Sequence, residues 1–288
     1  MVTASSQPGA GTDSTVSIPP KTNLDVDYYI EAGQSNCGRP QFPGTGSTGD
    51  SATPEQVSLY GNPINGFQIY NPGYSAVTFY RIQAGVNTML VDHLSNREMG
   101  SEVSFLTSLR NAGVDSCFLL KYGIGNTDLA NDWLNKYIYQ LFIYADKNIR
   151  IIKAAGNHPV LKAFIWIQGE NDAADSIKAR SYLDNLTAFF GKFDSFYNAE
   201  IATYNLSPNS INYKKIIGRV NGIDDPSEKY REIVRSAQAD YCSNKSNNAI
   251  LINTDNYPTF NNGHYTLSGQ IQFGIDIFDA LDGRLILQ

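Results

Sequence analysis

Short apolar runs alternate with longer segments of helical spacing along most of the chain. Five runs predict buried β-strands: residues 26–31 (VDYYIE), 116–122 (SCFLLKY), 160–168 (VLKAFIWIQ), 214–220 (KKIIGRV) and 249–253 (AILIN). Five segments with helical periodicity separate or follow them: residues 102–111, 129–155, 180–197, 227–241 and 268–281. Strands that are apolar on both sides and alternate with helices form parallel sheets covered on both faces. The pattern therefore predicts an α/β fold, a three-layer α/β/α sandwich around a parallel sheet of about five strands.

Two segments depart from this alternation. Residues 1–24 are rich in Ser, Thr, Gly and Pro and lack a hydrophobic period, which is typical of a flexible tail or linker. Residues 38–99 are loop-rich, with Gly, Pro and Asn around the short strand-like pieces 66–70 and 76–80. We therefore predict one domain over residues 25–288 that carries a loop-rich insert at about 38–99.

Composition narrows the class of protein. The net charge is −6, and Lys and Arg form no basic run, which argues against a nucleic-acid partner. The sequence contains no apolar stretch near the roughly 20 residues that span a bilayer, and no signal peptide is visible at its start. The linker-like first 24 residues favour an extracellular, cell-surface or virion-associated domain. Three widely spaced cysteines match no metal-binding spacing, so we expect neither a metal nor a cofactor. Oligomeric state cannot be predicted from this sequence.

Polar residues follow three of the predicted strands. Ser35 comes just after the first strand, Asn171 follows the strand at 160–168, and His264 lies in a polar loop after the last strand. Each has an ordinary interpretation alone: Ser35 and Asn171 as helix caps, and His264 as a loop residue. Because the carboxyl ends of parallel strands meet at one edge of a flavodoxin-like sheet, where ligands bind, we expect the three to lie together.

The motifs around these residues carry a family resemblance. They are Gly33–Asn36 (GQSN), Gly100–Glu102 (GSE), Lys121–Thr127 (KYGIGNT), Trp166–Asp172 (WIQGEND), Val234–Gln238 (VRSAQ) and the late His264. In this order they resemble the SGNH (GDSL-type) hydrolase superfamily, and more narrowly its sialate O-acetylesterase-like and acetylxylan-esterase branch of carbohydrate esterases. The resemblance extends from about residue 26 to the end of the sequence.

The resemblance implies roles for individual residues. Ser35 would be the nucleophile and His264 its base, with an oxyanion hole formed by Ser35, Gly100 and Asn171. Four further residues would support the site or contact substrate: Gln34, Gln168, Glu170 and Glu102. Two of these have alternatives, since Glu170 could form a buried ion pair with Arg235, and Glu102 could be a helix-start charge favoured by the helix dipole.

One position departs from the family pattern. The family places an Asp three residues before the histidine, and this sequence has Asn261 there. An Asp would orient the imidazole and stabilise its charged form. Three alternatives stay open: a backbone carbonyl orients His264 in a Ser–His dyad, Asp255 completes a triad from the same loop, or activity is weakened or absent.

The function that this resemblance implies is that of a serine esterase, a carboxylic ester hydrolase that removes O-acetyl groups from a carbohydrate through an acyl-enzyme. Two other functions remain as alternatives. One is an inactive glycan-binding or receptor-binding domain that retains the esterase fold. The other is a lipase or thioesterase, which preference for long acyl chains would reveal.

Overall fold

A seven-stranded sheet forms the centre of the computed structural model, which describes residues 24–38, 52–75, 77–88, 98–221, 227–260 and 263–283. Its strands are β1 (Leu24–Gly33), β2 (Phe67–Tyr70), β3 (Tyr80–Arg81), β4 (Cys117–Gly123), β5 (Asn157–Ile167), β6 (Lys214–Gly218) and β7 (Ala249–Ile252). They lie in the order β3-β2-β4-β1-β5-β6-β7, and every neighbouring pair is parallel except β2–β3. The predicted α/β class is confirmed.

The sheet is larger than the five strands that the sequence predicts. The additional strands, β2 and β3, have four and two residues and belong to the insert at 38–99. β2 lies within the strand-like piece 66–70 and β3 begins at the end of 76–80, but runs this short give too little periodicity to be counted as strands of the sheet. They are held as strands by pairing at the edge of the sheet, where β2 lies parallel to β4.

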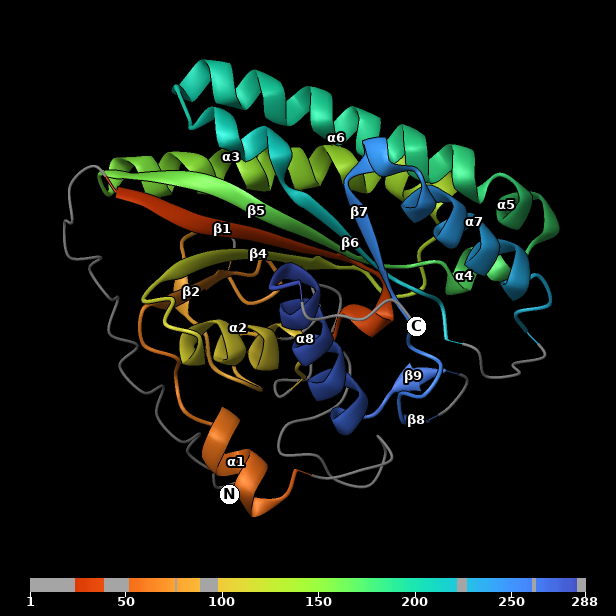
Figure 1. Ribbon diagram of the computed structural model, residues 1–288, viewed down its shortest axis with the longest axis horizontal. Helices are drawn as coiled ribbons and strands as arrows, with labels where there is room; N and C mark the ends of the chain where they lie inside the picture. The colour runs from red at the N-terminus through yellow and green to blue at the C-terminus, as the bar shows by residue number, and fades with distance from the viewer. Residues whose placement is uncertain are drawn as a thin grey trace, which may run out of the picture.

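Helices cover both faces of the sheet (Figure 1). One face carries α3 (Ile138–Ala154), α6 (Tyr182–Tyr204) and α7 (Arg231–Ser243), and the other carries α2 (Glu102–Asn111) and α8 (Leu267–Leu281), with α1 (Pro54–Tyr60) beside α2. The remaining short elements are η1 (Ser35–Cys37), η2 (Leu129–Tyr137), α4 (Glu170–Ala173), α5 (Ser176–Arg180), η3 (Pro208–Asn212), η4 (Lys245–Asn247), β8 (Thr259–Phe260) and β9 (His264–Tyr265). None of the helices in the described ranges is long and apolar enough to cross a membrane.

The core on the α3, α6 and α7 face is strongly aromatic. Five fully buried rings form what we call the aromatic layer: Trp133, Phe164, Trp166, Phe189 and Phe193. Their centroids lie 4.4 Å apart for Trp166 and Phe189 and 4.8 Å apart for Phe164 and Phe193. Rings at these separations add directional contacts to the burial of large apolar areas. This layer fixes the helices against the sheet and holds β5 in place.

Candidate active site

The turn that carries Ser35 begins where β1 ends. Gly33, the last residue of β1, packs so closely on β5 that a Cβ atom there would come within 1.9 Å of the Ile167 carbonyl oxygen. The next N–H, of Gln34, donates to this same carbonyl at 2.8 Å. The chain then turns into η1, whose first residue is Ser35. Glycine is thus required before the turn, and Ser35 lies at the carboxyl end of a central strand.

His264 reaches Ser35 across the edge of the sheet. Its Nε2 atom lies 2.8 Å from Ser35 Oγ, although the two residues are 229 positions apart. His264 stands on β9, which pairs with β8 in a two-stranded ribbon, and the Phe260 ring lies 5.9 Å from the imidazole. Ser35 is buried, with 6% of its surface exposed. The structure therefore brings together the two residues that the motifs single out as nucleophile and base.

Asn36 joins the serine turn to the histidine ribbon. Its Oδ1 atom accepts a hydrogen bond from the Tyr265 N–H at 3.0 Å, and its Nδ2 atom donates to the Gly263 carbonyl at 3.2 Å and to Glu170 at 2.6 Å. These contacts flank His264 on both sides. Sequence reasoning quoted Asn36 only as the last letter of a motif, and the available signal was its position next to Ser35.

Gln34 and Gln168, which follow β1 and β5, connect the ends of these strands by a side-chain hydrogen bond. The Gln168 amide donates to Gln34 Oε1 at 3.2 Å, to the Thr127 carbonyl at 3.1 Å and to Asp172 at 2.6 Å. Tyr182 donates its hydroxyl to the Gln168 carbonyl at 2.8 Å. Burial raises the pKa of Asp172 to about 6. Both glutamines are buried, and their hydrogen bonds connect the ends of β1 and β5.

Asn171, the predicted oxyanion donor of the Trp166–Asp172 motif, lies on α4 beside this network. Its backbone N–H is 3.5 Å from Gln34 Oε1, which places it next to the residue that precedes Ser35. Its Nδ2 atom donates one hydrogen bond, at 3.3 Å, to the carbonyl of Asn126. A side-chain amide has two N–H groups, and this hydrogen bond within the described residues uses one of them.

Gly100 is close to the serine turn, but its N–H has a partner other than the one expected. A Cβ atom on Gly100 would meet the Cys37 carbonyl oxygen at 2.2 Å, so the two backbones are in contact. The Gly100 N–H, however, donates to Glu102 Oε1 at 3.1 Å. This differs from the sequence expectation of an oxyanion donor. The reason is that Glu102, at the start of α2, folds back over the same loop.

Glu102 is part of a group of charges that we call the buried charge cluster: Glu31, Glu102 and Lys121, each fully buried. Lys121 Nζ lies 2.8 Å from Glu102 Oε1 and donates to the Thr88 carbonyl at 2.8 Å. Burial lowers the pKa of Lys121, but Glu102 and Glu31 outweigh this effect, and the pKa is raised overall. Glu102 is therefore an ion-pair partner rather than only a helix-start charge.

Glu31 connects this cluster to the serine turn. Its Oε1 atom accepts from Ser101 Oγ at 3.3 Å and lies 3.5 Å from Cys37 Sγ. Burial and the nearby Glu102 raise the pKa of Glu31 to about 8. Sequence reasoning assigned no role to Glu31 or Lys121, although each is a charge within an apolar strand run and they occupy paired positions of β1 and β4.

Asp255 and Glu170 have partners that the sequence did not predict. Asp255 receives both arms of the Arg235 guanidinium, at 2.7 and 3.0 Å, and Arg219 lies 3.7 Å away. The alternative that Arg235 pairs with Glu170 is therefore wrong. The Glu170 carboxyl instead accepts from Asn36, and burial raises its pKa. Asn261 lies outside the described residues.

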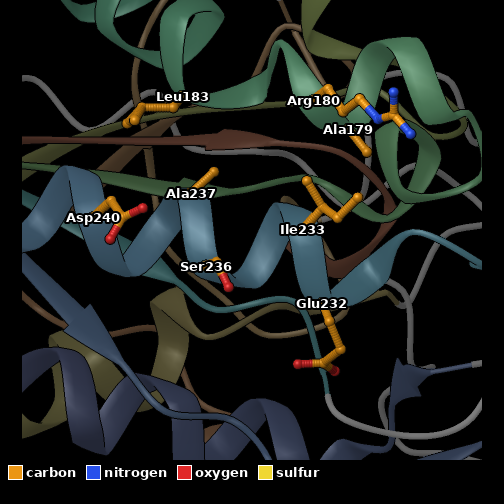
Figure 2. Close-up of a pocket in the computed structure, with 8 residues that line it drawn as sticks. All are labelled: Ala179, Arg180, Leu183, Glu232, Ile233, Ser236, Ala237 and Asp240. Atoms are coloured by element: carbon orange, nitrogen blue, oxygen red, sulfur yellow. The ribbon is translucent and has the colours of Figure 1, made fainter.

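A groove of about 450 Å³ lies elsewhere on the molecule, between α7 and the α5–α6 segment. Figure 2 shows Arg180 and Leu183 on one wall and Ile233 and Asp240 on the other. Its lining contains none of the predicted site residues. Among the residues that the structure describes, no three His, Cys, Asp or Glu side chains are grouped to hold a metal ion.

Comparisons with known proteins identify a family and a fold. The family described as carbohydrate esterase, sialic acid-specific acetylesterase, matches residues 25–282. A solved structure of a protein from Arabidopsis thaliana aligns with a TM-score of 0.67 and 18% identity over 91% of this chain and 100% of that one. NanS aligns with a TM-score of 0.58 and 12% identity over 91% and 98%. A carbohydrate acetylesterase from Xanthomonas citri aligns with a TM-score of 0.52 and 12% identity, over 91% of this chain and 58% of that one. A comparison with curated protein sequences found no match.

Proposed function

The chain belongs to the sialic acid-specific acetylesterase family of carbohydrate esterases, and on this premise we propose that it removes O-acetyl groups from a carbohydrate through an acyl-enzyme on Ser35. Family membership makes the protein a carboxylic ester hydrolase that acts on an acetylated carbohydrate. The observation that carries the proposed mechanism is the 2.8 Å contact between His264 Nε2 and Ser35 Oγ. A serine hydroxyl in direct contact with an imidazole is the arrangement that activates a weak nucleophile.

In the acylation step, Ser35 Oγ attacks the acetyl carbonyl carbon while His264 Nε2 takes the hydroxyl proton. The carbonyl oxygen becomes an oxyanion, which we assign to the Ser35 N–H and the second N–H of the Asn171 side chain. The C–O bond to the sugar then breaks, and His264 returns its proton to the leaving sugar oxygen. In the second step water attacks the acetyl-serine, with His264 again as base, and acetate leaves.

Two predicted residues receive smaller parts in this mechanism. Gly100 contributes to the oxyanion hole only if its N–H exchanges Glu102 for the substrate oxygen, so we assign it to the wall of the site. Asp255 is held by Arg235, so we assign it to the stabilisation of the loop after β7. Ser35 and His264 are thus proposed as the nucleophile and base of the mechanism.

A chromogenic acetate ester tests the mechanism. We expect Ser35→Ala to lower kcat by about 10⁴-fold or more, since removal of a serine nucleophile leaves only binding and oxyanion stabilisation. Ser195→Ala is a matched control, because Ser195 is an exposed serine on α6 whose hydroxyl bonds only the Gly191 carbonyl among the contacts observed. Wild-type acetate release no faster than that of Ser35→Ala would overturn the proposal. Retention of acetylated glycan without acetate release would indicate a binding domain instead.

A further inference from the structure

The Asn36 side chain holds the backbone of the histidine ribbon on both sides of the imidazole. Its oxygen accepts from the N–H after His264, and its nitrogen donates to the carbonyl before His264, at 3.0 and 3.2 Å. Gly263 and Tyr265 therefore cannot shift relative to Asn36 without breaking one of these bonds. Asn36 is 2% exposed, so solvent provides little substitute for a lost partner.

The orientation of the Asn36 amide is determined by its partners. A backbone N–H can only donate and a backbone carbonyl can only accept, so Oδ1 must face Tyr265 and Nδ2 must face Gly263. The Glu170 carboxyl, 2.6 Å from Nδ2, supports the same orientation from the other side. The backbone of Asn36 is fixed as well, because the buried Gln270 of α8 donates to its carbonyl at 2.9 Å.

Asn36 is also the residue that follows Ser35 in η1. One short turn therefore carries Ser35, the proposed nucleophile, and forms hydrogen bonds to the segment that carries His264, the proposed base. The glycine at position 263 has a φ of 87°, and the ribbon itself has only two residues in each strand, so the ribbon's own structure gives little rigidity. A displacement of about 1 Å between reacting groups can lower a rate on the order of 100-fold.

We propose that Asn36 is a positioning residue that fixes His264 against Ser35, with Glu170 holding the Asn36 amide in place. This inference rests on the proposed Ser–His mechanism. Asn36 contacts neither Ser35 Oγ nor the imidazole in the hydrogen bonds observed, so it acts through the backbone of the ribbon.

The first test compares Asn36→Ala with Asn148→Ala. Asn148 is a matched control because it is also a fully buried asparagine, and its amide donates to Tyr28 at 3.3 Å in the core between α3 and β1. We expect Asn36→Ala to lower kcat for a chromogenic acetate ester about 100-fold with KM within threefold of wild type. We expect Asn148→Ala to keep kcat within threefold. A kcat for Asn36→Ala within threefold of wild type would overturn the inference.

The second test uses Asn36→Asp, which keeps the size of the side chain. Its carboxyl still accepts from Tyr265, but when ionised it cannot donate to Gly263 and is repelled by Glu170. When protonated it regains one donor. We therefore expect the ratio of variant to wild-type kcat to rise as the pH falls from 8 to 5.5, which a merely structural role would not produce. If the ratio of Asn36→Asp to wild-type kcat does not change with pH, the inference is contradicted. This test also applies if Asn36→Ala fails to fold.

Ser35→Ala distinguishes a failure of the proposed Ser–His mechanism from a failure of the positioning role of Asn36. If Ser35→Ala and wild type release acetate equally, the proposed mechanism fails. If Ser35→Ala is inactive while both Asn36 variants behave like wild type, only the positioning role of Asn36 is overturned.

Discussion

The aromatic layer and the buried charge cluster lie on opposite faces of the same sheet, and both are closed to solvent. Side chains alternate along a strand, so Ile30 of β1 packs with the aromatic face while Glu31 points to the α2 side. The layer is held by ring contacts such as the 4.4 Å approach of Trp166 and Phe189. The cluster is held by the 2.8 Å contact of Lys121 and Glu102.

The aromatic layer and the buried charge cluster differ in their effect on stability. Burying rings stabilises a fold, whereas burying charges costs free energy even when they are paired. The cluster nevertheless lies directly under the serine turn, since a Cβ atom on Gly38 would come within 2.5 Å of Lys121 Nζ. We infer that the aromatic layer supplies stability, and that polar residues next to the turn define geometry. Three substitutions test this division of roles.

The largest effect is expected in the aromatic layer. Phe189 is fully buried against Trp166, Trp133 and Phe164, so Phe189→Ala leaves a cavity and should lower the free energy of unfolding by about 3–5 kcal/mol. The kcat per folded molecule should stay within twofold. Urea unfolding and kcat on the folded fraction measure the two quantities. Ile143→Ala, at a 63% exposed position of α3, is the control. A large fall in kcat would show that the layer also determines site geometry.

At the proposed oxyanion hole we expect the reverse of the Phe189→Ala result, a large loss of kcat with little loss of stability. Asn171→Ala should lower kcat about 100- to 1,000-fold, equivalent to about 2.7–4 kcal/mol, because one donor to the oxyanion is lost. The melting temperature should change by less than about 2 °C, since the side chain makes one long hydrogen bond to a carbonyl. Asn135→Ala removes a similar amide–carbonyl contact, to Ala130, away from the site and should leave kcat unchanged. Unchanged activity of Asn171→Ala would remove this residue from the oxyanion hole.

The same contrast explains how much the sequence reveals. Apolar periodicity identified the strands at β1, β4, β5, β6 and β7, because burial of both faces depends on the spacing of residues and little else. The parallel order then predicted that Ser35 and His264 meet at one edge, and the structure has them 2.8 Å apart. Membership in the carbohydrate esterase family confirms the resemblance that the motifs carried.

Polar partners were harder to predict. The sequence suggested Glu170 as a partner of Arg235, and the structure pairs Arg235 with Asp255 instead. The sequence suggested that the Gly100 N–H faces the substrate oxygen, and in the structure it donates to Glu102. A polar group often lies within a few ångströms of several possible partners. Which partner it contacts depends on its side-chain rotamer and on which buried donors and acceptors still need a hydrogen bond. No pattern along one sequence contains this information.

The most specific effect is a pH dependence of stability, and it concerns Glu31 in the buried charge cluster. Burial and Glu102 raise its pKa to about 8, against an ordinary value of 4.5. The folded protein therefore keeps a proton on Glu31 that the unfolded chain releases above pH 4.5. The stabilisation due to this group is fully present below pH 4.5 and is lost as the pH rises through 8, with a slope of at most about 1.4 kcal/mol per pH unit.

Glu31→Gln should abolish this dependence, because a glutamine keeps the oxygen that accepts from Ser101 and carries no proton to lose. The free energy of unfolding of the variant, relative to wild type, should rise steadily between pH 5 and pH 8 in urea titrations. Glu55→Gln, at an exposed position of α1, should show no such trend. Parallel curves for Glu31→Gln and wild type would mean that Glu31 is ionised in the folded state.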